Sequence, residues 1–496
     1  MFRIHQTFAV GAAVLAGLIA FTTTTAGAPE PTKVRRPFVV VTSNASSART
    51  LARAERARGA RVRYVFNNVI SGFSARMDEA SVSRLRSNRA VRHVNLDRLV
   101  QVKESVAVTR STTTGLWGLD RIDQRDLPLD GRINTAGRGQ GAAVYVVDTG
   151  IRSDQAQFGS RVAAGYSVLT GSPGNGTDCN GHGTYVASVV GGTSSGVAPE
   201  STLIPVTTVG CTGMGLASDL IAGLDWIVAD HQEGVPAVAN ISLYGPLFQP
   251  LNEAVDRTVA DGVVVVAAAG NEANVACDHS PSSARSAITV AASEQDDAMA
   301  PWSGWGDCVD IVAPGNQTLA GIADPPTGGA VVVQGTSIGA AFTSGAAAVV
   351  LGINSQLGAA GAIAELINTA TPNVLTGLPP GTPNRLLYIG NPLAPTGIPA
   401  SIAVPGQPVL QGVQVTFRPG GDRGSRFGRY QVRGSSAYRG RLTLTIAGRS
   451  IDRRRVAPGS FRYLTRVGRR ISSVRLVVRP ADTSLSASSV RVQVRP

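Results

Sequence analysis

The middle of the chain, residues 116–390, alternates apolar runs with amphipathic stretches, and this alternation restricts the fold more than any other sequence feature. The apolar runs have strand length and read GAAVYVVDTG, STLIPVTTVG, AVANISLYG and GVVVVAAAGN. Segments of helical period lie between them, such as SDLIAGLDWIVADH and LNEAVDRTVADG. Continuously apolar strands alternating with helices are typical of a mostly parallel sheet covered on both faces. We therefore predict an α/β domain whose functional side chains gather at the carboxyl ends of the strands.

Two regions with different patterns flank this α/β part. Residues 37–102 read as strand, helix, strand, helix, strand, which predicts a small α+β domain. Residues 103–115 have no strong periodicity and read as an exposed linker. Residues 400–496 alternate apolar and polar residues with period two, which predicts a small all-β domain resembling an antiparallel sandwich.

The first 28 residues have the features of a secretory signal peptide. Arg3 supplies positive charge, residues 9–21 are apolar, and residues 26–28 are small. The apolar run is too short to span a membrane as a helix. We expect cleavage near Ala26 or Ala28, secretion of the protein, and no membrane span in the remaining chain.

Secretion affects the interpretation of the four cysteines, which are Cys179, Cys211, Cys277 and Cys308. All four are able to pair in an oxidising compartment, and the sequence allows three pairings. A zinc site is the alternative, but it is disfavoured because the sequence has no close Cys-x-x-Cys pair.

The net charge of +13 is unevenly distributed. Residues 29–110 hold 17 Lys and Arg against 6 Asp and Glu, residues 111–399 hold 9 against 24, and residues 400–496 hold 19 against 3. The basic carboxy-terminal region, residues 400–496, is expected to dock on the acidic central domain or on anionic surfaces, unless its Arg content is only a compositional bias. Nucleic-acid binding is disfavoured because no aromatic stacking motif accompanies the charge.

Ser337, in the segment GTSIGAAFTSGAAAVV, is either a helix cap or a nucleophile. A nucleophilic serine needs a base and an acid that orients the base. Of the histidines in the central domain, His182 is flanked by glycines at a predicted helix start. His231 ends an amphipathic helix, as a surface or C-cap residue, and His279 lies in a polar loop beside Cys277. Asp148 ends an apolar strand and is the candidate acid.

These segments resemble the subtilisin-like serine proteases, in particular the proteinase K and aqualysin branch. VYVVDTGI, DCNGHGT and GTS resemble the family's Asp, His and Ser motifs, and they occur in the same chain order. WGLDRIDQRDLPLDG, from Trp117, resembles the start of the mature enzyme, and TPNRLLY resembles the end of the catalytic domain. The resemblance covers roughly residues 37–390 and implies a monomeric, secreted serine endopeptidase that needs no cofactor for its chemistry.

The resemblance assigns roles to individual residues. It implies that Ser337 is the nucleophile, His182 the general base, Asp148 its orienting acid and Asn271 an oxyanion donor. It also implies two strand edges and a pocket wall that bind substrate: Gly213, Met214 and Gly215; Ser242, Leu243, Tyr244 and Gly245; and Ala268, Ala269 and Gly270. It favours the disulfides Cys179–Cys211 and Cys277–Cys308. A structural calcium ion bound by Asp310 and by carbonyls near Arg285 and Ala287 is a further expectation.

Residues 29–110, with a core at 37–102, resemble the family's inhibitory propeptide. The expected organisation is therefore a signal peptide at 1–28, a propeptide at 29–110, a peptidase domain at 111–395 and an Arg-rich domain at 400–496. The resemblance places the self-processing bond between Thr109 and Thr114. Because the propeptide is basic and the central domain acidic, we expect salt to weaken the inhibition.

Several positions depart from the family pattern. Tyr185 follows the His motif where the family has His, Ile338 replaces Met after Ser337, and the helix after Ser337 lacks a proline. Tyr244 and Met214 replace small residues at the substrate edges. The alternative function is a secreted, catalytically inactive scaffold that binds peptides. An esterase is disfavoured because GTSIG lacks the strand–turn–helix context of a nucleophile elbow.

Overall fold

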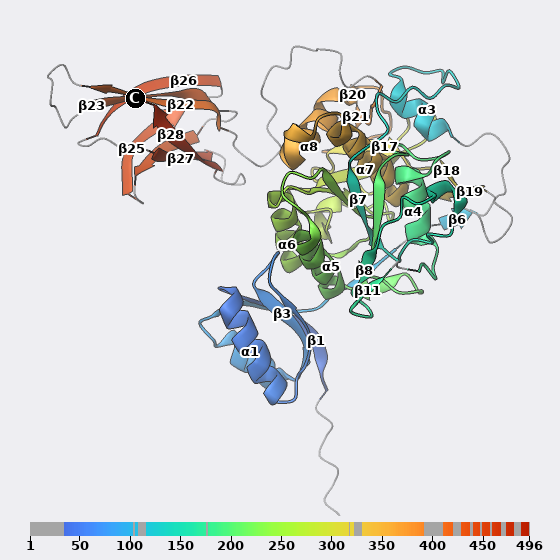
Figure 1. Cartoon of the computed structure of the whole chain (residues 1–496), viewed down its shortest axis with the longest axis horizontal. Helices are drawn as coiled ribbons and strands as arrows, with labels where there is room; N and C mark the ends of the chain where they lie inside the picture. Colours follow the sequence, from blue (N-terminus) through green and yellow to red (C-terminus); the bar gives the residue numbers. More distant parts are fainter. Residues whose placement is uncertain are drawn as a thin grey trace, which may run out of the picture.

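The computed structural model describes residues 34–102, 105–107, 116–174, 177–316, 318–321 and 330–390, together with seven strands between residues 410 and 495. These residues form an amino-terminal α+β domain, a central α/β domain and a carboxy-terminal all-β region (Figure 1).

A sheet of ten strands forms the centre of the α/β domain. Eight neighbouring strands are parallel, and the short strand at each edge is antiparallel to its neighbour. From edge to edge the strands are β20 (Thr371–Pro372), β21 (Arg385–Leu386), β17 (Ile311–Pro314), β16 (Ile288–Ser293), β14 (Val264–Ala268), β12 (Ala237–Ile241), β7 (Ala143–Asp148), β10 (Thr202–Thr207), β8 (Gly165–Ser167) and β9 (Ser172–Gly174). The predicted mostly parallel sheet is confirmed.

Helices cover both faces of this sheet because both faces are apolar. Val144 and Val146 of β7 pack in one core with α4 (His182–Gly191), α7 (Thr336–Ile353) and α8 (Gly358–Thr369). The alternate residues Tyr145 and Val147 pack in a second core with α5 (Ala217–Asp230) and α6 (Gln249–Ala260). Neighbouring residues of a strand point to opposite faces, so a continuously apolar strand serves two cores.

Among the described residues, one helix, α7, is long and apolar enough to cross a membrane. It is a core helix here, because 89% of it is buried inside the protein, where it packs on β12, β14, β16 and α4. Gly345 allows the close approach of α4, since a Cβ at this position would lie 3.1 Å from the carbonyl oxygen of Val190.

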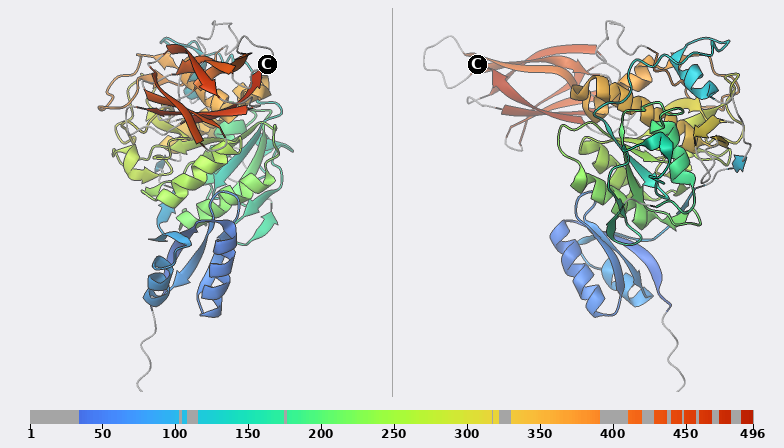
Figure 2. Two further views of the ribbon diagram at one scale, coloured as in Figure 1. Left: turned by 90° about the vertical axis from the view of Figure 1, so that its left-hand side faces the viewer. Right: turned by 45° about the vertical axis from the view of Figure 1, so that its right-hand side comes forward.

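The amino-terminal domain is a four-stranded antiparallel sheet with two helices and its own core. Its elements are β1 (Arg36–Thr42), α1 (Ala45–Ala57), β2 (Arg61–Phe66), β3 (Gly72–Met77), α2 (Glu79–Arg86) and β4 (Val91–Leu96). The segment predicted as one central strand is a hairpin, because a polar turn at Asn67 and Asn68 divides it into β2 and β3. Both views of Figure 2 show this domain at one end of the α/β domain, next to α5 and α6.

The carboxy-terminal region is all-β, as predicted. Its seven strands are ordered β25-β24-β27-β28-β22-β23-β26, and every pairing is antiparallel except β22 with β28. The strands are β22 (Leu410–Pro419), β23 (Gly428–Ser436), β24 (Gly440–Ile446), β25 (Arg449–Val456), β26 (Gly459–Val467), β27 (Ser473–Pro480) and β28 (Ser488–Arg495). Docking of this region on the catalytic domain or on anionic surfaces stays a prediction, and so does a monomeric state.

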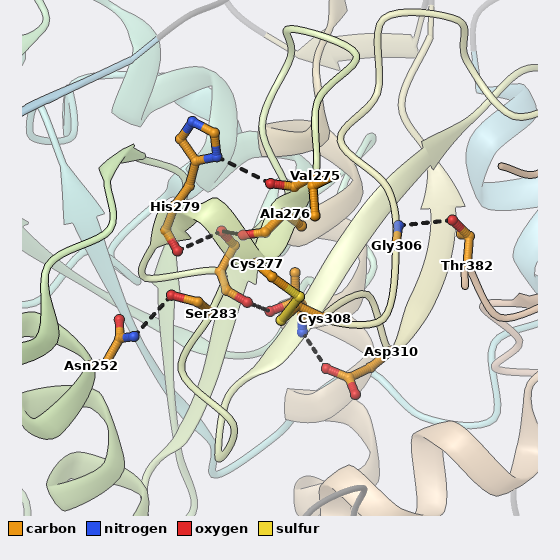
Figure 3. Close-up of a disulfide and its surroundings, with 12 residues drawn as sticks. Asn252, Val275, Ala276, Cys277, His279, Ser283, Gly306, Cys308, Asp310 and Thr382 are labelled. Atoms are coloured by element: carbon orange, nitrogen blue, oxygen red, sulfur yellow. Dashed lines mark hydrogen bonds between the residues drawn. A yellow bond between two sulfur atoms is a disulfide. The ribbon is translucent and has the colours of Figure 1, made fainter. Parts of the chain in front are cut away.

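Two disulfides pair the cysteines locally, as the resemblance implied. Cys179 is bonded to Cys211, and Cys277 is bonded to Cys308. Figure 3 shows the second bridge, which ties the loop carrying Val275, Ala276 and His279 to the segment that leads to Asp310. A bridge across roughly 30 residues is expected to stabilise the fold by about 3–4 kcal/mol on the chain-entropy model.

Candidate active site

Three neighbouring parallel strands bring the predicted site residues to one edge of the sheet. Asp148 is the last residue of β7, Ser242 directly follows β12, and Asn271 lies three residues beyond β14. The order β14-β12-β7 makes these strands adjacent, and the carboxyl ends of parallel strands share an edge. The sheet therefore brings Asp148 to the same edge as two side chains that lie more than 90 residues later in the sequence.

His182, the first residue of α4, meets Asp148 at this edge. Its Nδ1 lies 2.6 Å from Asp148 Oδ1, and both side chains are buried. Gly183 makes this approach possible, because a Cβ there would lie 2.2 Å from the carbonyl oxygen of Gly150. Gly181, with φ of 102°, turns the chain into the helix in a conformation that favours glycine.

Burial raises the pKa of Asp148 above its ordinary value, and the neighbouring His182 acts in the opposite direction. The backbone N–H of Thr149 donates to Asp148 Oδ1 at 2.7 Å, which also favours the ionised carboxylate. A buried carboxylate facing an imidazole orients the ring and favours its protonated form.

Asp178 joins the segments that carry Asp148 and His182. Its Oδ1 accepts from the Thr149 hydroxyl at 2.8 Å and from the Gly181 backbone at 2.7 Å, while Oδ2 accepts from the backbone and hydroxyl of Thr184 at 2.9 and 2.7 Å. This buried carboxylate therefore fixes the loop after β7 and the start of α4 in one arrangement. Asp178 lies in the same motif as His182, but its role could not be predicted from the sequence.

Ser337 lies in the first turn of α7 and contacts Ser242. The Ser337 hydroxyl is 3.4 Å from the carbonyl oxygen of Ser242, and the Ser242 hydroxyl donates to the carbonyl of Ser337 at 3.1 Å. Ser337 is buried, with 2% of its surface exposed in the presence of the amino-terminal domain. The small neighbour Gly335 and the apolar Ile338 pack this helix start against the sheet, so the change from Met at position 338 leaves the core filled.

Asn271 is held against the same helix start. Its Oδ1 accepts from the backbone N–H of Thr336 at 2.8 Å and from the Thr336 hydroxyl at 2.7 Å. The Thr336 hydroxyl also accepts from the backbone N–H of Gly270 at 3.1 Å. These bonds fix the orientation of the Asn271 amide. Its oxygen faces the start of α7, and its nitrogen is the atom that can donate to another group. Thr336 was not identified from the sequence.

A strand from the amino-terminal domain lies between the two predicted substrate edges. Strand β5 (Leu99–Gln101) pairs antiparallel with β11 (Met214–Leu216) on one side. On the other side, Gln101 and Tyr244 exchange backbone hydrogen bonds of 3.0 and 3.2 Å. The backbone N–H of Val102 donates to the carbonyl of Gly213 at 2.9 Å. The predicted edges thus bind an extended peptide by its main chain, as in strand addition.

The first disulfide connects this edge to the histidine loop. Cys179 lies three residues before His182, and Cys211 lies two residues before Gly213. The Asn180 side chain adds a bond of 2.9 Å to the carbonyl of Cys211. The bridge therefore fixes the spacing between a predicted catalytic group and a peptide-binding edge.

Tyr244 places a large ring near the predicted pocket wall. The ring is buried, packs edge-on against His279 with centroids 5.7 Å apart, and lies 3.8 Å from the position of a Cβ at Gly270. Leu243, Ala268 and Ala269 are also buried, while Met214 is exposed. Tyr244 therefore occupies space beside Gly270, and the pocket roles of Ala268, Ala269 and Gly270 stay predictions.

Asp310 accepts one hydrogen bond, from the backbone N–H of Thr289 at 2.8 Å (Figure 3). Burial raises the pKa of Asp310 to about 7. The described residues contain no group of three or more His, Cys, Asp or Glu side chains placed to hold one metal ion. Calcium at Asp310 would thus take most of its ligands from main-chain carbonyls, a donor set that calcium accepts. Asp310 stays a predicted ligand.

The geometry defines an α/β protein with a buried Asp–His pair and a serine at a helix start, which is the arrangement of a serine hydrolase. Comparison with protein families agrees. Residues 139–390 match the subtilase family (Peptidase_S8), and residues 30–103 match the peptidase inhibitor I9 family. The chain belongs to the subtilase family of serine proteases and carries an I9-type propeptide.

Individual relatives support this assignment. The chain is 40% identical to an extracellular serine proteinase of Thermus sp. (strain Rt41A), over 66% of this chain and 78% of that protein. It is 37% identical to alkaline serine exoprotease A of Vibrio alginolyticus, over 66% of this chain and 60% of that protein. A solved structure of a cold-adapted subtilisin-like serine proteinase matches with a TM-score of 0.52 and 36% identity, covering 56% of this chain and 99% of that one.

Membership of this family makes the protein a serine-type peptidase, a class that needs no cofactor for its chemistry. The inhibitor match also establishes the amino-terminal domain as a propeptide of the zymogen type, and it is called the prodomain below.

Proposed function

We propose that the protein is a secreted serine endopeptidase that cuts peptide bonds with Ser337, His182 and Asp148, and that it is made as a self-processing zymogen. The observation that carries this proposal is that Asp148, His182, Ser337 and Asn271 are all held at one edge of the sheet. Asp148 is bonded to His182, Ser337 contacts Ser242, and Asn271 is bonded to Thr336. An extended segment of the same chain already pairs with both strand edges beside these groups.

The proposed mechanism follows from the direction of each group. Because Nδ1 of His182 faces Asp148, Nε2 is the ring nitrogen that takes the Ser337 proton as Oγ attacks the scissile carbonyl. Asp148 holds the ring in this tautomer and stabilises the imidazolium. The imidazolium then gives its proton to the leaving amine, and water releases the acyl group by the reverse steps.

The oxyanion that forms in this attack needs donors that are already in place. Asn271 supplies one through its amide nitrogen, since its oxygen is engaged by Thr336. The backbone N–H of Ser337 supplies the second, because the first N–H groups of a helix have no partner within the helix. Both donors are rigid, which is the condition for stabilising charge that develops in the transition state.

The proposal includes secretion of the protein. The predicted signal peptide, residues 1–28, lies outside the described residues, and support comes from two disulfides and from a relative that is named extracellular. The prodomain would cover the cleft until the chain cuts itself. Calcium at Asp310 would stabilise the peptidase domain and take no part in the chemistry.

Replacing Ser337 with alanine tests the proposal. Wild type should hydrolyse an unfolded protein substrate and react at Ser337 with a fluorophosphonate, a reagent for activated serines. Ser337→Ala should lose at least about 10⁴-fold in turnover and should not be labelled. Ser355→Ala is the matched control, because Ser355 is exposed just beyond α7. Folded wild type that binds peptides but neither cuts nor labels would instead establish the inactive scaffold.

A further inference from the structure

Tyr244 extends a large ring from one segment of the candidate site to another. Its backbone belongs to residues 242–245, the segment that follows β12. A Cβ at Gly270 would lie 3.8 Å from Cδ2 and 4.0 Å from Cε2 of the ring, and Gly270 belongs to residues 268–271, at the end of β14. Carbon atoms in contact are about 3.5–4.0 Å apart. The space between Gly270 and the ring is therefore about one carbon atom wide.

A second contact holds the ring in this place. It packs edge-on against His279, with centroids 5.7 Å apart, and 6% of Tyr244 is exposed. His279 lies in β15 (His279–Ser280), which pairs antiparallel with β13 (Gly245–Pro246), directly after Tyr244. Figure 3 shows the His279 ring, whose Nδ1 lies 3.3 Å from the carbonyl oxygen of Val275. Movement of the Tyr244 ring would therefore expose an aromatic surface and break its contact with a positioned histidine.

The pairing of the prodomain tail indicates how a substrate would approach this ring. Gln101 and Tyr244 are directly opposite each other in an antiparallel bridge. In a substrate that pairs in the same way, the residue two positions farther along lies opposite Ser242, which contacts Ser337. Side chains two residues apart on an extended chain point to the same side, and directly opposite residues share a face. The side chain of the residue at the nucleophile therefore lies on the same side as the Tyr244 ring.

The proposed oxyanion donor defines the same position from the second segment. Asn271 directly follows Gly270, whose Cα borders the ring. A carbonyl that reaches both Asn271 and Ser337 belongs to a residue flanked by the two segments that the ring connects. The side chain of this residue and the ring of Tyr244 therefore compete for one space.

We propose that Tyr244 restricts the residue before the cleaved bond to glycine or alanine, an inference that rests on the proposed function. A methyl group fits a gap about one carbon atom wide, whereas the ring of phenylalanine or the branched side chain of leucine would overpack it. Tyr244 is thus a specificity-determining residue and takes no part in proton transfer. The reaction at Ser337 is the same for every substrate.

The Tyr244 hydroxyl makes it possible to separate the effect of the ring from that of its polar group. The hydroxyl oxygen is buried and has no hydrogen-bond partner among the described residues. Tyr244→Phe therefore removes no hydrogen bond that the described residues form, and it keeps the ring. Tyr244→Ala removes the ring and keeps the backbone groups that pair with Gln101. The two variants are thus a matched pair for testing the ring.

The test measures kcat/KM of the self-processed enzyme on peptide amides of one upstream sequence that carry glycine, alanine, leucine or phenylalanine before the reporter group. Wild type should prefer alanine to phenylalanine by roughly 100-fold, about the loss expected when an aromatic side chain is denied burial. Tyr244→Ala should raise kcat/KM for the phenylalanine substrate by roughly 100-fold and change the alanine substrate less than about fivefold. Tyr244→Phe should keep the wild-type ratio within about threefold, because it keeps the ring.

Leu247→Ala is a further control, because Leu247 is 52% exposed and lies three residues beyond Tyr244. It should leave the preference unchanged. Labelling of Ser337 with the fluorophosphonate counts the active enzyme in each preparation, so a loss of stability in Tyr244→Ala does not alter the comparison. A uniform loss of kcat/KM for all substrates in Tyr244→Ala would assign the ring a structural role and overturn the proposal.

The outcomes separate this inference from the proposed function. Wild type that is labelled at Ser337 and cleaves the phenylalanine substrate as fast as the alanine substrate overturns the role of Tyr244 and leaves the protease intact. This result does not require any variant to fold. Wild type that is not labelled and cleaves none of the substrates overturns both.

Discussion

The prodomain contacts the catalytic domain in two regions that use different atoms. Its body presents the turn at residues 67–69 to Asp225 of α5, whose carboxylate accepts three backbone N–H bonds of 2.6–3.0 Å. Its tail, residues 99–102, exchanges main-chain bonds with Gly213 and Tyr244. The body thus docks through specific side chains, among them the Asp225 carboxylate, whereas the tail is held by main-chain bonds that an extended peptide of another sequence also offers. If substrates bind as the tail does, this difference would allow one site to accept peptides of varied sequence and one specific propeptide.

Asp225 gives the largest expected effect. Asp225→Ala removes a charged acceptor from three donors, and bonds to charged groups contribute about 1.5–3 kcal/mol each without full additivity. We expect inhibition by a separately added prodomain to weaken roughly 100-fold. The measurement is the inhibition constant against a small peptide substrate.

Glu233→Ala is the control for Asp225→Ala, since Glu233 is an exposed carboxylate just beyond α5. It removes the same charge and should change inhibition less than threefold. Equal effects of the two variants would mean that net charge, not the turn contact, holds the body.

Gly245 tests the tail side of the comparison. A Cβ at Gly245 would lie 2.5 Å from the carbonyl oxygen of Leu99 and 3.1 Å from Val100 Cγ1, both atoms of the tail. Gly245→Ala should displace an extended peptide and weaken about two backbone hydrogen bonds, near 1 kcal/mol each, which is roughly 30-fold.

The Gly245→Ala effect should appear in KM for extended peptides and in prodomain inhibition, while a short ester substrate should be hydrolysed at the wild-type rate. Gly210→Ala is the control, because the nearest atom to its Cβ would be 3.9 Å away. If peptides longer than three residues bound Gly245→Ala normally, substrates would not use the edge that holds the tail.

Asp97 lies between the two contact regions in sequence, and its raised pKa predicts that docking depends on pH. Its Oδ1 accepts from the backbone N–H of Ser218 at 3.1 Å, at the start of α5, and burial raises its pKa to about 6. A raised carboxyl pKa means that docking takes up a proton, so affinity increases as pH falls through 6 toward the ordinary value near 4.

We expect prodomain affinity for Ser337→Ala enzyme to be roughly tenfold higher at pH 5 than at pH 7. Asp97→Asn should lose this dependence while keeping an acceptor for Ser218. The pKa of the neighbouring Asp219 is also raised, chiefly by burial. Because Asp219 is present in both proteins, the difference between them isolates Asp97. An unchanged pH profile in Asp97→Asn would assign the dependence to other carboxyls.

The exposed ion pair Arg92–Glu253 should have the smallest effect. Its side chains are 51% and 23% exposed and its atoms are 3.3 Å apart. Such pairs contribute about 0.2–1 kcal/mol and are screened by salt. Arg92→Ala should weaken inhibition no more than about fivefold at low salt and have no effect at 1 M salt. A larger loss that persisted in salt would indicate packing by the Arg92 stem.

The sequence predicted the elements of the site better than the contacts between distant segments. The motifs around Asp148, His182 and Ser337 were found because each places glycine beside a strand end or a helix start, and their roles came from the family resemblance. The roles of Asp178 and Thr336 were missed, since a residue that holds two loops together has no local pattern of its own. The roles in catalysis stay predictions until the serine variant is measured.

The charge counts predicted a general attraction between the prodomain and the central domain, but they did not predict which residues form the contacts. Within the described residues, the ion pairs across this contact are Arg63–Asp219 and Arg92–Glu253. The turn that meets Asp225 was not predicted, because the sequence of β2 and β3 reads as one strand. The register of the tail likewise depends on two paired segments, so it cannot be predicted from the sequence of residues 99–107 alone.

The pairing of prodomain strand β5 with both edges beside the candidate site has a consequence for activation. Before the cut, the body and tail are tethered to the catalytic domain, and their effective concentration does not depend on how dilute the protein is. After the proposed self-processing cut, the same contacts would belong to two molecules. Release of the prodomain would then depend on dilution. The enzyme would stay inhibited at high protein concentration and become active when it is diluted.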